Sequence, residues 1–326
     1  MSLKYLILAA SALTLAACSG AVDDAANKAK DTASDAAAMA KDAASDAMSA
    51  TETMAGGMKD SAMNAAHKTK LMAVLAMQDD KAKARFEFRN PGDTLMFLGV
   101  EPGMKVAEAL PGGGWYSKIL IPYLGDEGHL TGLDYSLKMW PEFSFMTPER
   151  IEAKKTWPAD WTERAQDWRA GSKATIDAAT FGARNTEADG TYDAVLFIRA
   201  MHNVSRFEAN GGYMTEAIAD THAMLKPGGI VGVVQHSGPE TNSDEWATGS
   251  NGYLKKSAVV AAFEGAGFKL VGESDINANP KDVPSNTDGV WRLLPSLRGH
   301  DDNPEKKAKM EAIGESNRMT LKFKKL

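Results

Sequence analysis

The 326-residue sequence predicts an α/β protein with a doubly wound, mostly parallel sheet of seven strands and an antiparallel last strand. Strand-like apolar runs alternate with helix-like segments from about residue 67 onwards. The central runs, 193–198 and 230–235, are mostly apolar, which is typical of parallel strands covered on both faces. The last two strand candidates, 268–275 and 318–325, have no convincing helix between them, so we expect an antiparallel edge.

Residues 1–17 predict a targeting signal. Lys4 precedes an apolar stretch that is too short for a membrane-spanning helix and that ends in small residues. Cys18, the only cysteine of the chain, follows at once. The run Leu15-Ala16-Ala17-Cys18 resembles the lipobox of bacterial lipoproteins, which implies cleavage before Cys18 and acylation of its thiol. We therefore expect a lipid-anchored protein on the periplasmic or another extracytoplasmic face of the bacterial cell envelope; the alternative is an incidental cysteine.

Residues 18–66 predict a tether behind the lipidated cysteine. From residue 19 onwards the segment has no Leu, Ile or aromatic residue, and the pattern of 30–36 returns eleven residues later at 41–47. Alanine favours helix, but a stripe of Ala and Met buries too little to form a core. A fluctuating helix or a disordered spacer is the favoured interpretation, and a self-associating or membrane-surface helix is the alternative.

The globular domain is expected over residues 67–326. A helix over 69–85 should be broken at Asn90-Pro91-Gly92, and further helices are expected from the glycine turn to about 123, at 213–225 and near 257–266. The remaining strands are expected at 104–109, 129–134 and 174–177. The stretch 277–302 predicts an ordered surface loop, and the basic run 306–309 a solvated helix face.

A glycine turn carries the chemistry. Gly112, Gly113 and Gly114 stand where the first strand passes into a helix, and glycine there permits positive φ and close approach of a ligand to the backbone. Asp134 ends the next strand, where an acid can accept hydrogen bonds from ribose hydroxyls. Together they predict a site for a ligand that contains a nucleoside.

The turn resembles motif I of class I S-adenosylmethionine-dependent methyltransferases, in which an acid is followed by three glycines at alternate positions. Glu108, Gly112 and Gly114 match that pattern, and Leu110 replaces the first glycine. Asp134 matches the ribose-binding acid of the family. The resemblance implies S-adenosylmethionine as cofactor, bound by these residues and Gly113, and a methyltransferase-type Rossmann-like fold.

Further segments resemble a group of predicted, often exported, bacterial methyltransferases, over about residues 71–326. These segments are Arg89-Asn90-Pro91, Gly112 to Tyr116, Met201-His202-Asn203, Gln235-His236 and Glu315 to Met319. The resemblance implies no particular methyl acceptor, and we expect a small molecule. The net charge of −6 argues against nucleic acid as a partner.

Four polar residues are candidates for catalysis. Arg199, His202 and Asn203 follow the strand 193–198, and His236 follows 230–235. If these strands are neighbours, both histidines lie at one edge of the sheet, where ligands bind in such folds. A histidine base would then take a proton from the acceptor's nucleophile.

Two other interpretations of the histidines stay open. With Glu240 or Asp244 they would form a metal site, although two His without fixed ligand spacing are weak evidence, and no metal is predicted. Alternatively, both histidines only form hydrogen bonds with the backbone of loops and have no chemical role.

Four tryptophans fall close together, at 140, 157, 161 and 168. The spacing of the last three favours a helix packed on the sheet over a lid that closes a pocket. Met139 and Trp140, before Pro141, are expected in a loop.

The predicted location conflicts with the predicted cofactor, because S-adenosylmethionine is made and used in the cytoplasm. The leading hypothesis is a membrane-anchored, extracytoplasmic methyltransferase. The alternative is a non-methylating lipoprotein that uses the same scaffold to bind a ligand or an envelope partner. A nicotinamide dehydrogenase is a third and weaker hypothesis.

Overall fold

The structure is a computed structural model that describes residues 28, 38, 41–42, 45, 62–300 and 302–326. The predicted signal, Cys18 and nearly all of the tether lie outside the described residues; the five described positions before residue 62 are helical and exposed. None of the helices in the described part of the chain is both long and apolar enough to cross a membrane. Residues 65–326 form one unit, which contains the sheet and the candidate site.

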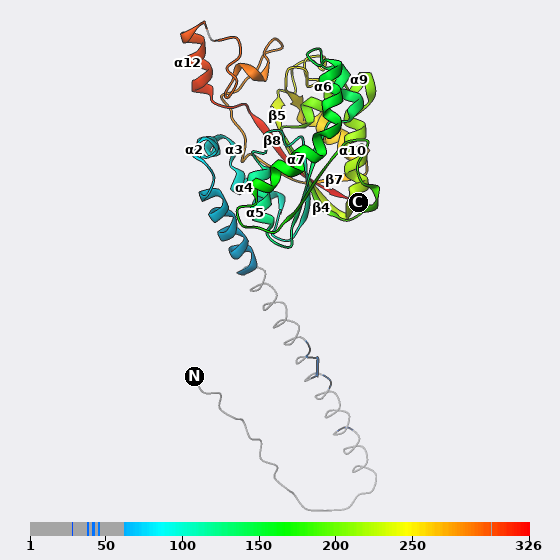
Figure 1. Cartoon of the computed structure of the whole chain (residues 1–326). Helices are drawn as coiled ribbons and strands as arrows, with labels where there is room; N and C mark the ends of the chain where they lie inside the picture. The colour runs from blue at the N-terminus through cyan, green and yellow to red at the C-terminus, as the bar shows by residue number, and fades with distance from the viewer. Residues whose placement is uncertain (1–27, 29–37, 39–40, 43–44, 46–61, 301) are drawn as a thin grey trace, which may run out of the picture. The chain divides into compact units, whose positions relative to one another are not determined.

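The sheet has the strand order β3-β2-β1-β4-β5-β8-β7, with the short β6 paired to β5 (Figure 1). The strands are β1 (Lys105–Ala109), β2 (His129–Asp134), β3 (Thr175–Thr180), β4 (Tyr192–Ile198), β5 (Leu225–Gly238), β6 (Leu254–Lys255), β7 (Phe268–Ser274) and β8 (Arg318–Lys325). β1 to β5 are parallel, and β8 runs antiparallel to both β5 and β7. The predicted doubly wound sheet with an antiparallel end is confirmed, with β6 as an addition.

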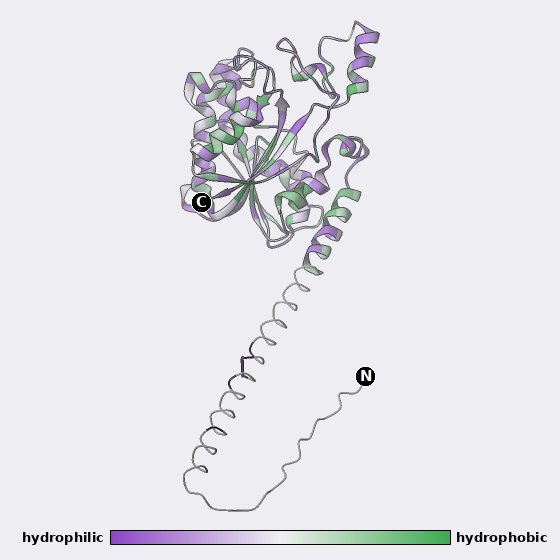
Figure 2. Cartoon of the chain, turned by 180° about the vertical axis from the view of Figure 1, so that it is seen from behind, coloured by the Kyte–Doolittle hydropathy of each residue, from purple (hydrophilic) through white to green (hydrophobic). Residues whose placement is uncertain are grey.

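Helices cover both faces of the sheet. A helix that runs through residue 76 is followed by α2 (Asp80–Lys83), α3 (Phe86–Arg89), α4 (Pro91–Leu98), α5 (Ser117–Leu124), α6 (Pro148–Glu152), α7 (Trp157–Ala165), α8 (Met201–Ser205), α9 (Glu208–Gly211), α10 (Tyr213–Met224), α11 (Lys256–Gly265) and α12 (Pro304–Ile313). Short 3₁₀ helices are η1 (Leu137–Glu142), η2 (Ala153–Thr156), η3 (Gln166–Trp168), η4 (Thr186–Ala188) and η5 (Val290–Arg292). Several helices carry hydrophobic and hydrophilic residues side by side (Figure 2), as expected for helices with one buried face.

The core has one layer on each face of the sheet. On one face Phe197 and Phe323 pack with Phe263 of α11. On the other face Leu196 belongs to the same cluster of buried side chains as Trp161 of α7. Because the central strands are buried on both faces, they read as continuous apolar runs, and this is why the sequence predicts them so well.

The expected helix over 69–85 is wrong in its second half. The helix ends at residue 76, and α2 begins at once because the side chain of Asp79 accepts a hydrogen bond from the backbone N–H of Ala82 at 2.7 Å. The predicted break at Asn90 is confirmed, because α3 ends at Arg89 and Asn90 has φ 38°. Pro91 then opens α4, since proline lacks the N–H that a first helical turn leaves unpaired.

A helix does lie between β7 and β8, contrary to expectation. α12 has no buried residue, in agreement with the predicted solvated face.

Candidate functional site

The glycine turn lies at the carboxyl end of β1, beside the end of β2. The backbone N–H of Leu110 donates to the carbonyl of Leu133 at 2.7 Å, which joins the turn to the strand that ends in Asp134. Leu110 has φ 53° and Gly112 has φ 54°. Leucine therefore adopts the left-handed conformation for which glycine is the usual residue, and the turn keeps its shape without the first glycine.

The three glycines of the turn have different reasons to be glycine. A Cβ on Gly114 would lie 2.3 Å from the Trp168 ring, so packing under η3 explains this residue. Gly112 and Gly114 both have positive φ, 54° and 77°. Of the three, only Gly113 lacks positive φ and would place a Cβ with no atom within 4 Å, so space is open next to its backbone.

Glu108 lies inside the protein rather than at its surface. Its exposed fraction is 4%, and the Ser117 hydroxyl at the start of α5 donates to its carboxylate at 2.6 Å. Burial raises the pKa of Glu108 to about 7, although the hydrogen bond from Ser117 opposes the rise. The side chain thus holds the two ends of the glycine turn together.

Asp134 ends β2 with a carboxylate oxygen that has no hydrogen-bond partner. The residue is buried, and Oδ2 makes no hydrogen bond among the described residues. Lys154 Nζ lies 3.7 Å from this oxygen and 3.9 Å from the centre of the Trp140 ring. Burial raises the pKa of Asp134, and Lys154 opposes that rise. A buried carboxylate oxygen that accepts no hydrogen bond, at the carboxyl end of a parallel strand, fits a ribose hydroxyl.

An aromatic cluster lies over the turn. Its buried members are Met139, Trp140, Phe143, Val204 and Tyr213, and Leu110 packs against them. Met139 and Trp140 therefore belong to the core cluster in η1 and not to a loop as expected, because a 3₁₀ helix accommodates Pro141.

The other three tryptophans pack α7 and η3 onto the sheet, as predicted. Trp157 stacks on Trp161, and Trp168 meets Trp161 edge-on, both with ring centres 5.9 Å apart. Trp161 is fully buried over Gly132 of β2, where a Cβ would lie 2.9 Å from the ring.

The two histidines converge as predicted, with ring centres 5.1 Å apart. Gln235 Oε1 lies 3.3 Å from the backbone N–H of His202 and 3.2 Å from its Nδ1. An amide oxygen only accepts, so Nδ1 carries the proton and Nε2 has the free lone pair. Burial, the Arg199 charge and the Arg206 charge lower the pKa of His202 to about 4, against the opposing effect of the hydrogen bond that His202 donates to Gln235. The ring is therefore neutral at pH 7.

His236 is held from the other side by the C-terminal strand. Its Nδ1 contacts the Ser316 hydroxyl, and the register of β5 with β8 places Arg318 directly opposite His236. Burial lowers the pKa of His236 well below its usual value, and the charges of His202 and Arg318 lower it further.

A cavity of about 290 Å³ brings the four predicted catalytic residues together. Arg199, His202, Asn203 and His236 line it with Arg318 and residues 290, 291 and 293–296. A second, small cavity of about 10 Å³ touches Arg199 and Arg318 as well, and also Tyr116, which follows the glycine turn. The residues that line the larger cavity are therefore close to the end of the glycine turn.

The carboxylates considered as metal ligands are engaged elsewhere. Glu240 accepts hydrogen bonds from Ser257, and Asp244 pairs with Lys255. In the described part of the chain no group of three or more His, Cys, Asp and Glu is arranged to hold a metal ion.

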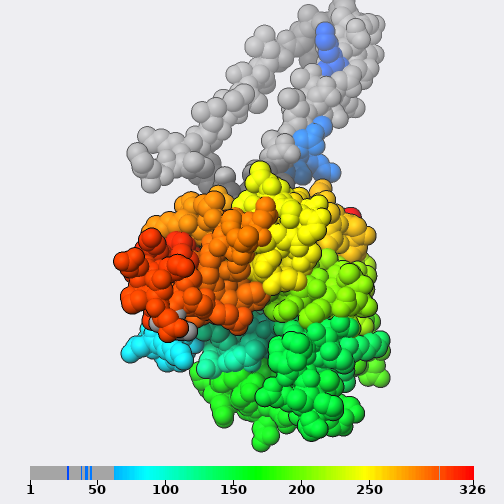
Figure 3. Space-filling view, turned by 90° about the horizontal axis from the view of Figure 1, so that it is seen from above, coloured from blue at the N-terminus to red at the C-terminus, as the bar shows by residue number. Residues whose placement is uncertain are grey.

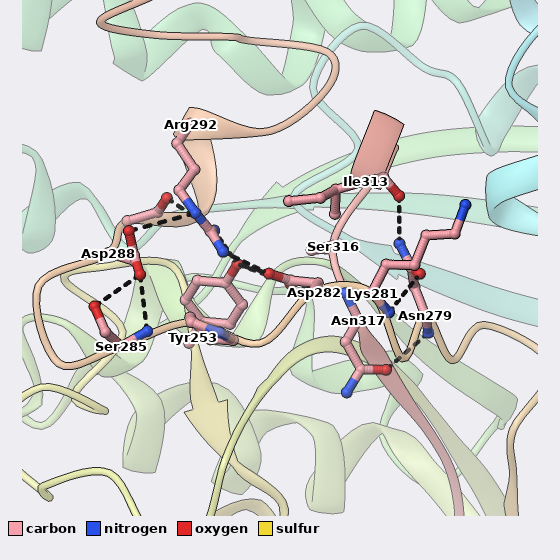
Figure 4. Close-up of polar contacts among 12 residues, drawn as sticks. Tyr253, Asn279, Lys281, Asp282, Ser285, Asp288, Arg292, Ile313, Ser316 and Asn317 are labelled. Carbon is pink, nitrogen blue, oxygen red and sulfur yellow. Dashed lines mark hydrogen bonds and ion pairs between the residues drawn. The ribbon is translucent and has the colours of Figure 1, made fainter. Parts of the chain in front are cut away.

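The loop 277–302 forms the roof of the cavity. Figure 3 shows its orange segment side by side with the yellow residues before it, and the backbone N–H of Val290 donates to Asn251 at 2.8 Å. Figure 4 shows its anchor, in which buried Asp282 binds both Arg292 and the Tyr253 hydroxyl, each at 2.8 Å. The predicted ordered loop is confirmed.

Sequence reasoning assigned no role at the site to Gln235 or Arg318, and it assigned Trp291 only an anchoring role in the loop. Gln235 and Arg318 belong to segments that carried the narrower resemblance, and this was the available signal. Their contacts depend on strand register and on the path of the loop.

No family model matches the chain, and neither does any curated protein. Solved structures with a similar fold include a SAM-dependent methyltransferase from Aquifex aeolicus, with 12% identity over 78% of this chain and 98% of that one and a TM-score of 0.43. The Burkholderia thailandensis 1,6-didemethyltoxoflavin-N1-methyltransferase, solved with S-adenosylhomocysteine, has 13% identity over 80% and 88% and a TM-score of 0.41. The [4+2]-cyclase SpnF has 16% identity over 73% and 80% and a TM-score of 0.42.

Proposed function

We propose that this protein is a methyltransferase that uses S-adenosylmethionine and a small-molecule acceptor. The observation that carries the proposal is the buried oxygen of Asp134, which has Lys154 as an ion-pair partner but accepts no hydrogen bond among the described residues, next to a glycine-type turn. In a doubly wound fold this is where the ribose of a nucleoside ligand binds. Asp134 would hold the ribose, and the backbone of Gly112 and Gly113 would lie along the rest of the donor, which supplies an electrophilic methyl group.

The acceptor would bind in the cavity under the loop 277–302. His202 presents Nε2 as a neutral acceptor, so it would accept a hydrogen bond from the nucleophilic O–H or N–H of the acceptor and take its proton as the methyl group is transferred. Gln235 fixes the tautomer, and Asn203 lines the same cavity. Positioning of the two reactants supplies most of the acceleration in such a single-step transfer.

Calorimetric titration of the full chain with S-adenosylmethionine and S-adenosylhomocysteine tests the donor site. Asp134→Asn removes the charged acceptor and should lower the affinity for both by roughly tenfold or more. Asp167→Asn, the same change at an exposed aspartate, should leave the affinity unchanged. Absence of binding by the folded wild type would refute the proposal and favour the non-methylating scaffold.

A glycine pair tests the same site independently. The methyl group of Gly113→Ala meets no protein atom, so the stability should be unchanged. It would fill the space in which the donor contacts the backbone of the turn, so donor binding should weaken. Gly114→Ala should instead lower the stability through the Trp168 contact. Unchanged donor affinity in a folded Gly113→Ala variant would contradict the placement of the donor.

We further propose that the chain is anchored to the membrane through acylated Cys18, with the domain outside the cytoplasm. The support is the sequence of residues 1–18 alone. Labelling with radioactive palmitate in a bacterial host should mark the wild type and not Cys18→Ser, and fractionation should move that variant out of the membrane. Equal labelling of both forms would contradict the anchor.

A further inference from the structure

Two buried arginines and one half-buried arginine share one carboxylate near the acceptor cavity. Arg85, Arg89 and Arg318 all bond to Glu315, whose side chain is 1% exposed. Arg318 also donates to the carbonyl of Phe88 at 2.8 Å, while its Nε is buried without a partner among the described residues.

Arg199 adds a fourth guanidinium to this group. It follows β4 with φ 58°, an unusual conformation for a residue with a side chain. Within the described ranges its side chain makes no hydrogen bond and no ion pair, although it lines both the large and the small cavity. Burial lowers the pKa of Arg199 to about 9, and the charges of Arg318 and Arg85 contribute, so it is still charged at pH 7.

The charges around the cavity do not balance. Four guanidinium groups face one carboxylate, Glu315, and the nearby Asp282 is neutralised by Arg292. Both histidines are neutral at pH 7, so they neither add to the positive charge nor compensate it. Burial lowers the pKa of Arg89 to about 7, so it is only partly charged at neutral pH, and Arg85 does not line the cavity. Arg199 and Arg318 do line it, and buried charges need partners, so the net positive charge at the cavity wall favours an anion.

The loop adds apolar side chains to the lining of the cavity. Trp291, Leu293, Leu294 and Pro295 line the 290 Å³ space together with the polar residues. A volume of this size is at the lower end for small-molecule sites. The cavity therefore suits a compact molecule with one anionic end and one apolar end.

We propose that the cavity under the loop 277–302 binds a small organic anion, a carboxylate or a phosphate ester, through the guanidinium groups of Arg199 and Arg318. Arg199 is the principal ligand, because it has no other partner and because guanidinium binds planar oxyanions with two parallel hydrogen bonds. The anion site stands without methyl transfer. Its identification as the acceptor site rests on the proposed function, and it then makes the methyl acceptor an anionic molecule.

Titration calorimetry of the full chain at constant ionic strength tests the site with matched probes. Benzoate and phenyl phosphate should bind, and benzamide, the neutral analogue of benzoate, should not. The stronger of the two anions identifies carboxylate or phosphate as the preferred group. Equal binding of benzoate and benzamide, or binding of neither anion, would overturn the proposal.

Variants of two arginines test whether the anion binds at Arg199. Arg199→Gln should weaken anion binding by roughly tenfold or more, and Arg199→Lys should recover part of it. Arg298→Gln removes the same charge from an exposed position of the roof loop and should have little effect. An equal loss in both Gln variants would show general electrostatic attraction and overturn the site.

Fold and donor binding are measured on the same variants. Arg199→Gln removes an unpaired charge, so its melting temperature should not fall, and its affinity for S-adenosylmethionine should stay within about twofold of the wild type. A large loss of donor affinity would mean that Arg199 serves the donor carboxylate, which overturns a separate anion site. Failure of the wild type to bind S-adenosylmethionine, with anion binding intact, would refute only the methyltransferase proposal.

Discussion

Glu108 links the stability of the fold to pH. Its pKa is about 7 in the folded protein, against 4.5 as its ordinary value. Between these values the folded protein holds a proton that the unfolded chain has released, so the free energy of unfolding falls as pH rises from about 4.5 to about 7. The fall is on the order of 3 kcal/mol, from the cited energy of one pKa unit.

We predict that the free energy of unfolding of Glu108→Gln does not show this decrease between pH 4.5 and pH 7. Urea unfolding at pH 5 and pH 8 gives the change in the free energy of unfolding between the two pH values for each protein. Subtraction of the change in Glu108→Gln from that in the wild type cancels the contribution of other titrating groups. Glu163→Gln, at an exposed glutamate of α7, should keep the wild-type dependence. The same pH dependence in Glu108→Gln and the wild type would show that Glu108 is charged in the fold.

At the scale of an element, the turn after β1 makes a prediction about Leu110. Its φ of 53° penalises any residue with a Cβ, so Leu110→Gly should be more stable than Leu110→Ala by about 1 kcal/mol. Both lose the leucine side chain, so the comparison isolates the backbone. At residue 159, in the exposed part of α7, the wild-type alanine should be more stable than Ala159→Gly, as is usual inside a helix. Urea midpoints measure all four proteins, and an alanine advantage at Leu110 would contradict the strain.

The elements divide into those that local pattern predicts and those that it does not. β2 and β8 match their predicted ranges because apolar content and turn residues bound them. The meeting of His202 and His236 was predictable, since His202 follows β4 and His236 lies near the carboxyl end of the neighbouring parallel strand β5. The α2 boundary was missed although Asp79 is a regular capping residue, because the continuous helical composition masked it.

The charged part of the site lay beyond sequence reasoning for a topological reason. Arg85 and Glu315 are 230 positions apart, and their contact exists only because β8 inserts next to β5. The pairing of Arg318 with His236 depends on the register of that insertion, and a shift by one residue would turn Arg318 to the other face. Local patterns carry no information on such a register.

For the whole molecule, β8 is the strand that completes the sheet. It lies between β5 and β7, and Phe323 stacks on Phe263 of α11. A chain that ends at Asn317 loses the partner of both neighbours and several buried side chains, so it should show no cooperative unfolding transition. Removal of Leu326 alone, an exposed residue, should leave the transition in place. Near-ultraviolet circular dichroism during urea titration measures both, and a cooperative transition in the shorter chain would contradict an essential β8.

The position of β8 also determines when, during synthesis, the sheet can be completed. The ribosome adds roughly 5–20 residues per second, so a chain of this length needs on the order of 20–60 seconds before its last strand has been made. During that time the nascent polypeptide cannot close its sheet, whereas its first residues have long left the ribosome. The sheet therefore stays open until β8 is available, and the cavity gains Arg318, the first residue of β8, only at that stage.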